Sequence, residues 1–177
     1  MVEIDILQTT VRTLGICTCF KMYTYVNFYF RQSITTTFCH NGNNHKIKTI
    51  DGQSHNVTEI VTYDAKKDFV LFQNDINGNV PYLKLATQLP EEGEEIIVLG
   101  NPTGLESTLT RGIVSALREE NGIIYIQIDA AISPGSSGSP VLNLKGEVVG
   151  IATLKKMDCE SCNFAVSIKT IANQIGL

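Results

Sequence analysis

The sequence predicts an all-β protein of two antiparallel barrels that ends in a short helix. Its apolar residues occur in short runs separated by glycine, asparagine and aspartate, which is typical of β proteins. Dipeptides such as Asn-Gly stand between several of these runs and are hairpin-turn signals. A chain of 177 residues is long enough for two small barrels that share an interface.

The expected strands follow from the apolar runs. In chain order they are residues 47–50, 57–64, 69–73, 95–100, 107–116, 123–128, 148–154 and 164–167. The turn signals between them are Asp51-Gly52, Asn77-Gly78, Asn121-Gly122 and Lys145-Gly146. A polar, proline-containing stretch, residues 89–95, is typical of a linker. We therefore interpret residues 1–89 as the N-terminal barrel and residues 90–177 as the C-terminal barrel.

Only the end of the chain has a helical pattern. Ile168, Ile171, Ala172 and Ile175 recur at the spacing of one helix face,. Ser167 stands where an N-cap hydroxyl would accept a backbone N–H. These residues predict a short helix directly after the last strand.

Composition excludes several classes of partner. With 43% hydrophobic and 18% charged residues, the chain has the composition of an ordinary globular protein,. A net charge of −4 without a basic cluster gives no case for nucleic acid,. The acidic amino terminus does not have a signal-peptide pattern, and the apolar stretch 15–30 is too short to span a bilayer. We expect neither nucleic acid nor membrane as a partner, and a cytoplasmic location by default.

The five cysteines are Cys17, Cys19, Cys39, Cys159 and Cys162. An odd number argues against a closed disulfide framework. The pairs Cys17-x-Cys19 and Cys159-x-x-Cys162 have spacings that zinc sites use, but no fixed ligand set emerges. Reduced thiols, or one local disulfide between Cys159 and Cys162, are the alternatives. We expect no metal and no cofactor.

The most informative segment is residues 128–140, Ile-Asp-Ala-Ala-Ile-Ser-Pro-Gly-Ser-Ser-Gly-Ser-Pro. Ser137 lies within Gly135-Ser136-Ser137-Gly138, where glycines permit a tight turn and a close approach of a substrate carbonyl. In such a loop the amides of Gly135 and Ser137 can point at one oxygen, as an oxyanion hole requires. Taken alone, Gly-Ser-Ser-Gly is more typical of a Gly/Ser-rich surface turn.

The surroundings of this segment resemble the trypsin-like serine peptidases of the HtrA/Deg type. Asp129–Pro140 has that family's form Asp-Ala-Ala-Ile-x-Pro-Gly-x-Ser-Gly-x-Pro, and residues 98–105 resemble its Gly-Asn-Pro-x-Gly segment. Further similar segments are residues 110–116, 145–153 and 163–166. The resemblance covers about residues 44–177 and implies a chymotrypsin-like fold of two six-stranded barrels. Residues 1–40 diverge, so the first barrel is expected to be incomplete or poorly ordered there. No PDZ domain is expected, because the sequence stops just after its last helix.

The resemblance also implies a serine endopeptidase that hydrolyses polypeptide substrates through an acyl-enzyme, with Ser137 as nucleophile. Asp68 in Lys66-Lys67-Asp68-Phe69-Val70-Leu71 precedes an apolar strand and is similar to the family's Asp-Leu-Ala-Leu-Leu segment. A half-buried aspartate there holds an imidazole in one tautomer and stabilises its cation. Such a reaction needs neither metal nor nucleotide.

The catalytic base is assigned to His40. It is the nearest equivalent of the family's Thr-Asn-x-His-Val-Val segment, although Asn41-Gly42 follows it in place of the apolar pair. His45 is interpreted as a surface residue at the start of a strand. His55 is interpreted as a hairpin-tip residue.

The substrate pocket is expected to be apolar. Ala131 stands six residues before Ser137, at the position that forms the pocket floor in the family, and carries no charge. Ile151, Thr153 and Phe164 are expected near the walls. These residues predict cleavage after small or medium aliphatic side chains, with an extended peptide adding as a strand along Thr153 and the residues after it.

Two other readings of the chain stay open at this point. One is a catalytically inactive, eroded pseudoenzyme that keeps the C-terminal barrel and at most binds peptides. The other is a zinc-linked interaction module built on the cysteines. The distance from the His40 ring to the Ser137 hydroxyl separates the first of these from an active peptidase. The sequence assigns no oligomeric state.

Overall fold

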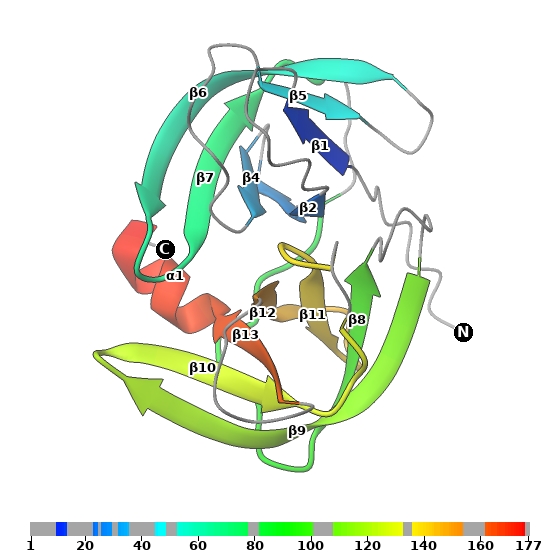
Figure 1. Ribbon diagram of the computed structural model, residues 1–177, viewed down its shortest axis with the longest axis vertical. Coiled ribbons are helices and arrows are strands. Elements are labelled where there is room, and N and C mark those ends of the chain that lie inside the picture. Colours follow the sequence, from blue (N-terminus) through cyan, green and yellow to red (C-terminus); the bar gives the residue numbers. More distant parts are fainter. Residues whose placement is uncertain are drawn as a thin grey trace.

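A computed structural model describes residues 10–13, 23–24, 26–29, 32–35, 45–48, 53–77, 82–100, 108–132, 136–153 and 162–175. These residues form thirteen strands and one helix. The N-terminal strands lie in the upper part of Figure 1 and the C-terminal strands in the lower part, with α1 beside them. The fold is therefore all-β apart from its end, as the apolar runs predict.

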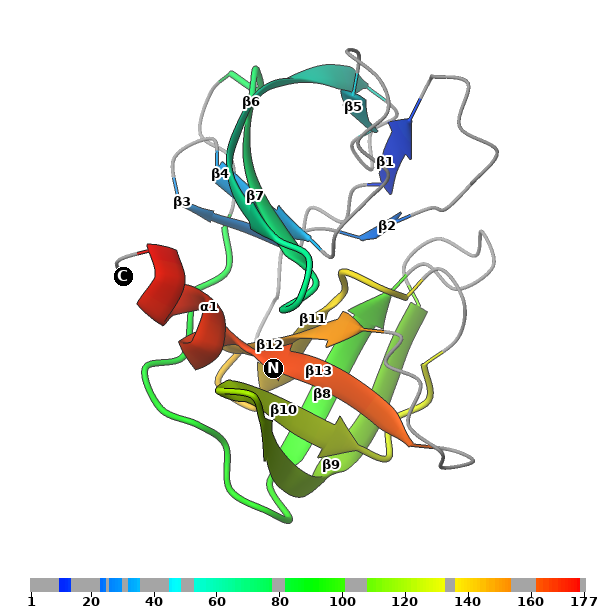
Figure 2. The same cartoon turned by 60° about the vertical axis from the view of Figure 1, so that its left-hand side comes forward.

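The N-terminal half forms a seven-stranded sheet in the order β2-β1-β5-β6-β7-β4-β3. Neighbouring strands are antiparallel, and the sheet curls strongly in Figure 2. Among the described residues this sheet is not closed, in keeping with the expectation that the first barrel is incomplete. The strands are β1 (Thr10–Thr13), β2 (Tyr23–Thr24), β3 (Val26–Tyr29), β4 (Gln32–Thr35), β5 (His45–Lys48), β6 (Ser54–Asp64) and β7 (Phe69–Asn74).

The C-terminal half forms a closed antiparallel barrel in the order β10-β13-β12-β11-β8-β9. This barrel confirms the chymotrypsin-like fold class for the half that contains Ser137. Its strands are β8 (Glu95–Gly100), β9 (Thr108–Glu120), β10 (Ile123–Ile128), β11 (Pro140–Asn143), β12 (Val148–Thr153) and β13 (Asn163–Ser167).

Two hairpins of this barrel follow from their turn residues. Asn121 and Gly122 have φ values of 54° and 75°, so the two-residue turn between β9 and β10 is of the kind that Asn-Gly favours,. In the β11–β12 turn, Asn143 Oδ1 accepts the N–H groups of Lys145 and Glu147, each at 3.0 Å. Gly146 completes that turn with a φ of 77°. Both turn signals are therefore confirmed.

The C-terminal helix is the predicted one. Helix α1 spans Ile168–Ile175, and Ser167 Oγ accepts the N–H of Thr170 at 3.2 Å, as an N-cap does,. Ile168 and Ile171 are buried on its inner face. In the parts of the chain that the structure describes, no helix has the length and apolar character needed to cross a membrane.

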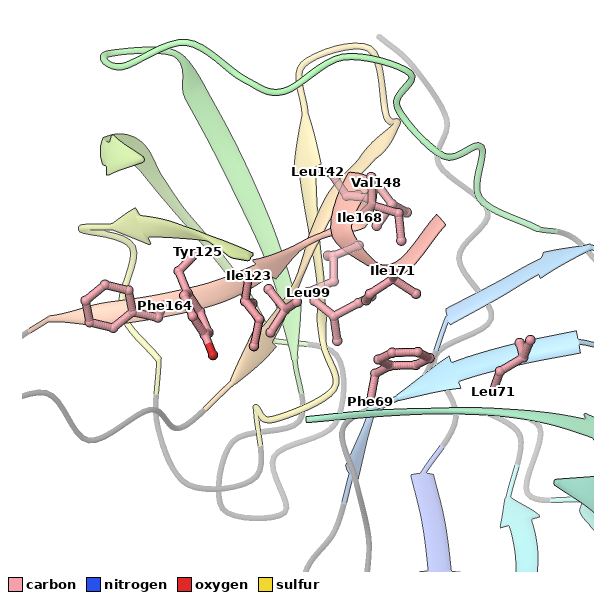
Figure 3. Close-up of a cluster of buried hydrophobic side chains, with 12 residues drawn as sticks. Phe69, Leu71, Leu99, Ile123, Tyr125, Leu142, Val148, Phe164, Ile168 and Ile171 are labelled. Atoms are coloured by element: carbon pink, nitrogen blue, oxygen red, sulfur yellow. The ribbon is translucent and has the colours of Figure 1, made fainter. Parts of the chain in front are cut away.

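Alternate residues of the barrel strands belong to two separate apolar clusters. The barrel interior holds Ile96, Val98, Val114, Ile126, Ile128, Ala130, Val141, Val149, Ala152 and Ala165. The second cluster, the interface cluster, joins both halves of the chain and is drawn in Figure 3. It contains Phe69, Leu71, Leu99, Ile123, Tyr125, Leu142, Val148, Ile151, Phe164, Val166, Ile168 and Ile171.

Phe69 and Leu71 are the N-terminal members of the interface cluster, at 0% and 3% exposure. Burying one such side chain contributes about 1.5–3 kcal/mol. In Figure 3 Phe69 lies next to Ile171, so the start of β7 packs against α1. Asp68, the residue directly before Phe69, is therefore held close to the C-terminal half of the chain.

The segment that connects the two halves of the chain is also hydrogen-bonded to the C-terminal barrel. Val148 N donates to the carbonyl of Lys84 at 2.8 Å, and Ala86 N donates to the carbonyl of Val148 at 2.9 Å. These bonds attach residues 84–86 to the first residue of β12. The division of the chain at residues 89 and 90 stays a prediction.

Candidate active site

Ser137 lies in a tight turn directly before β11. Ser139 N donates to the carbonyl of Ser136 at 3.0 Å, which closes a four-residue turn. Gly138 occupies the third position with a φ of 86°, a conformation that favours glycine,. Ser137 is 7% exposed. The sequence Ser-Ser-Gly-Ser therefore folds into a tight glycine turn, as expected around Ser137.

The turn is fixed to β12 by two backbone hydrogen bonds. Gly138 N donates to the carbonyl of Ala152 at 2.8 Å, and Ala152 N donates to the carbonyl of Ser139 at 2.8 Å. These bonds extend the pairing of β11 with β12 into the turn. The position of Ser137 is thus set by the last residues of β12.

Asp68 ends the turn between β6 and β7 and is half-buried. The hydroxyl of Thr153, the last residue of β12, donates to Asp68 Oδ2 at 2.6 Å. A distance this short is typical of a hydroxyl bound to a carboxylate. Thr153 itself is 6% exposed, so the donor side of the bond is buried. Ala152 and Thr153 therefore bring the Ser137 turn and Asp68 to the same end of one strand.

The turn that precedes Asp68 is organised by Asp64. Its Oδ1 accepts the N–H groups of Lys66 at 2.9 Å and Lys67 at 3.1 Å. Burial, the largest single effect, raises the pKa of the Asp64 carboxyl. The bonds from Lys67 and Lys66 and the Lys67 ammonium together outweigh burial and hold that pKa below its ordinary value. Asp68 has a φ of 50°, which is uncommon for a residue with a side chain,.

The segment that leads toward Ser137 is also anchored by side chains. Asp129 Oδ1 accepts the N–H of Ile113 at 2.6 Å, and Thr110 Oγ1 donates to the carbonyl of Ala131 at 3.0 Å. A Cβ on Gly112 would lie 2.2 Å from Asp129 Oδ1. Residue 112 of β9 must therefore be glycine, because a side chain there would collide with Asp129.

A further bond joins this segment to β13, because Asn163 Nδ2 donates to the carbonyl of Ala130 at 2.7 Å. The neighbouring Ala131, expected at the pocket floor, is exposed. Its floor role stays a prediction.

The expected pocket-wall residues differ in their surroundings. Ile151 and Phe164 are only 1% and 2% exposed and pack in the interface cluster, not along an open surface. The reason is strand alternation, since Ala152 and Ala165 pair with each other and point to the barrel interior instead,. Thr153, the third wall residue, directs its hydroxyl to Asp68.

Two of the predicted site residues, His40 and Gly135, lie outside the described residues. The base and one oxyanion donor therefore stay predictions. His45 is the first residue of β5. His55 lies on β6 with Nδ1 3.6 Å from Asp75 Oδ1, and the sequence interpretation gives it no catalytic part.

Two features of the site were not expected from the sequence. The Thr153 hydroxyl binds Asp68, and its only sequence signal is a polar residue at the end of the apolar run Val-Val-Gly-Ile-Ala. Ser139 is fully buried, and its hydroxyl has no hydrogen-bond partner among the residues that the structure describes. A Cβ on Gly100 would lie 2.9 Å from that hydroxyl and 3.0 Å from the hydroxyl of Ser136.

Of the five cysteines, only Cys162 lies among the described residues, so the zinc alternative stays untested. No group of three or more His, Cys, Asp or Glu side chains is gathered there as a metal ion would need. Cys162 is disulfide-bonded, so its sulfur is not a thiolate ligand. Cys159 lies outside the described residues.

Comparison with known proteins identifies similar chains. The family model described as "Trypsin-like peptidase domain" matches residues 19–151, a range that includes His40, Asp68 and Ser137. A putative serine protease HhoA of Synechocystis sp. is 35% identical over 141 residues, which is 72% of this chain and 34% of that protein. Serine protease HTRA1 of Xenopus laevis is 37% identical over 119 residues, 62% of this chain and 26% of that protein. The chain thus spans about a quarter to a third of these relatives.

A solved structure shows the same fold. The serine endoprotease from Yersinia pestis superposes with a TM-score of 0.81 at 24% identity, over 96% of this chain and 61% of that one. The similarity extends through both halves of the molecule.

Proposed function

The chain belongs to the trypsin-like peptidase domain family, and from that premise we propose that it is a serine endopeptidase acting on polypeptides. The observation that carries the proposal is the end of β12. Ala152 holds the Ser137 turn through two backbone bonds, and Thr153 holds Asp68 through its hydroxyl. One strand therefore supports both the proposed nucleophile and the proposed orienting carboxylate.

In the proposed reaction, Ser137 Oγ attacks the carbonyl carbon of the scissile peptide while His40 accepts its proton. Asp68 orients the imidazole and stabilises the cation that forms. The amides of Gly135 and Ser137 donate to the developing oxyanion. His40 then protonates the departing amine and leaves an acyl group on Ser137. Water, deprotonated by His40, releases the acyl group and restores the serine.

A serine hydroxyl without a base is a poor nucleophile at neutral pH, so the proposal depends on His40. The competing function is that of a catalytically inactive protein that at most binds peptides, and the sequence around His40 favours it. There Asn41-Gly42 replaces the apolar pair that follows the family's histidine. The two functions differ in whether Ser137 is activated.

A fluorophosphonate probe tests the activation of Ser137 directly. We expect one labelled serine in the folded chain and no label in Ser137→Ala. Ser115→Ala is the control, because Ser115 is an exposed serine on β9 away from the site, and it should label like the wild type. Persistent labelling of Ser137→Ala would show that another residue is the nucleophile. A folded wild type that does not label at all would favour the catalytically inactive, peptide-binding alternative.

A further inference from the structure

Lys67, the residue before Asp68, connects the β6–β7 turn to the C-terminal helix. Its Nζ lies 3.5 Å from Asp64 Oδ2, within the same turn. The same ammonium donates a hydrogen bond to Oε1 of Gln174, in the last turn of α1. Lys67 therefore has one partner in the turn and one in the helix, and its side chain is 26% exposed.

The β6–β7 turn needs stabilising contacts, because Asp68 is held at a φ of 50°. A residue with a side chain adopts that conformation only where its surroundings stabilise it. Three contacts to the C-terminal half surround Asp68. Thr153 binds its carboxylate, Phe69 packs against Ile171 of α1, and Lys67 binds Gln174. The first fixes the carboxylate and the other two fix the backbone on either side.

We propose that Lys67 and Gln174 are positioning residues for the carboxylate of Asp68, which they act on through the backbone of the β6–β7 turn. The inference rests on the proposed function, since it assigns Asp68 the task of orienting the imidazole. It gives α1 a role beyond packing, because the helix then supports the backbone beside Asp68 while Thr153 binds the carboxylate itself. Neither residue is assigned a contact with substrate.

Lys66 provides a matched control within the same turn. Its backbone N–H binds Asp64 Oδ1 as that of Lys67 does, and it carries the same charge. Its side chain is exposed and is not the one that binds Gln174. Lys66→Met and Lys67→Met therefore change the net charge equally, and only the second removes the contact with α1.

Variants of Gln174 distinguish the effect of the Lys67–Gln174 hydrogen bond from the effect of the Lys67 charge. Gln174→Leu removes the acceptor and leaves the net charge unchanged. Gln174→Glu keeps an acceptor at the same distance from the helix backbone. If Lys67 acts only through its charge, Gln174→Leu is harmless. If it acts through the contact, Gln174→Leu and Lys67→Met have the same effect.

The experiment measures kcat and KM of peptide cleavage for the four variants and for Lys67→Met/Gln174→Leu. We expect kcat to fall about three- to tenfold in Lys67→Met and in Gln174→Leu, with KM within twofold of the wild type. The double variant should be no worse than either single variant, because both remove one contact. Gln174→Glu and Lys66→Met should stay within twofold of the wild type.

Hydrogen exchange of the Phe69 amide gives a second readout that does not depend on turnover. It should be faster in Lys67→Met and Gln174→Leu than in Lys66→Met, since the turn opens more often without the contact. The inference is overturned if kcat and Phe69 exchange are unchanged in both variants, or if Lys66→Met has an equal effect. A wild type that neither cleaves nor labels contradicts the proposed function instead. The exchange rates then still decide whether the contact holds the turn.

Discussion

The hydroxyl of Thr153 donates to Oδ2 of Asp68 at 2.6 Å, across the interface between the two halves of the chain. The preceding residue, Ala152, makes both backbone bonds that hold the turn of Ser137. The geometry between proposed nucleophile and proposed orienting carboxylate is therefore built into two successive residues of β12. This arrangement explains how residues far apart in the sequence are held in one site.

Replacing Thr153 by valine removes the hydroxyl and keeps the shape of the side chain. Hydrogen bonds to charged groups contribute about 1.5–3 kcal/mol, so we expect kcat/KM for peptide cleavage to fall about tenfold or more. Thr153→Ser, which keeps the donor, should retain most of the activity. Equal activities of the valine and serine variants would show that the bond to Asp68 has no catalytic consequence.

Replacing Gly100 by alanine should disturb the nucleophile turn. The new Cβ would lie 2.9 Å from Ser139 Oγ and 3.0 Å from Ser136 Oγ, closer than such atoms normally approach. We expect slower fluorophosphonate labelling of Ser137, by about tenfold, and partial recovery when Ser139→Ala is added, measured relative to Ser139→Ala alone.

Gly122→Ala is the control for Gly100→Ala. Gly122 has a φ of 75° and open space around its Cβ position, in a hairpin turn remote from Ser137. Its alanine variant should lose thermal stability through backbone strain and keep its labelling rate at temperatures where it is folded. If both variants lose labelling only in proportion to unfolding, Gly100 has no specific effect on the turn.

Stability should depend on the charge of Asp64 at acid pH. The folded state lowers the pKa of this carboxyl, so its contribution is complete above the unfolded value of about 3.9 and is lost as the pH falls through the folded value,. We expect the urea midpoint of the wild type to exceed that of Asp64→Asn at pH 6. The two midpoints should converge as the pH is lowered toward about 2. A gap that is constant or grows on acidification contradicts this assignment.

The cleavage profile should be dominated by Val, Ala, Leu or similar residues before the scissile bond. Ala131 is apolar and exposed, and a buried carboxylate is what selects lysine or arginine in trypsin,. A peptide-library profile measures the preference, and Ala131→Asp should raise the share of basic residues. A wild-type profile dominated by lysine or arginine would show that another group forms the pocket floor.

Much of the C-terminal barrel and the helix could be predicted from local patterns. The apolar runs, the Asn121-Gly122 turn and the Ser167 cap act over a few residues, and each is found in the structure. Strand β11 was not predicted, because its four residues begin with a proline and directly follow the serine turn. The short N-terminal strands were missed for a similar reason, since runs of two to four residues have no clear period.

For the site, too, some features follow from local sequence and others depend on tertiary packing. The sequence motif predicts Ser137 and Asp68 as site residues, but it gave no signal for the contact between Thr153 and Asp68, which depends on how two distant elements pack. It gave no signal for the direction of Ile151 and Phe164 either, because an apolar run does not reveal which alternate residues face the interface cluster. Their place at the pocket wall stays a prediction. The positive φ of Asp68 had no local signature either, since aspartate is common in ordinary turns,.

The central claim is that Ser137 is a nucleophile activated by His40, and the rate of peptide hydrolysis in a double-mutant series tests it most directly. His40→Ala and Ser137→Ala should each lose activity by several powers of ten, and the double variant should be no worse, because the residues act as one unit. Wild-type activity should rise with pH through a single titration near the ordinary histidine value of about 6.5. A folded wild type without activity, or a His40→Ala variant that cleaves as fast as the wild type, would contradict the claim.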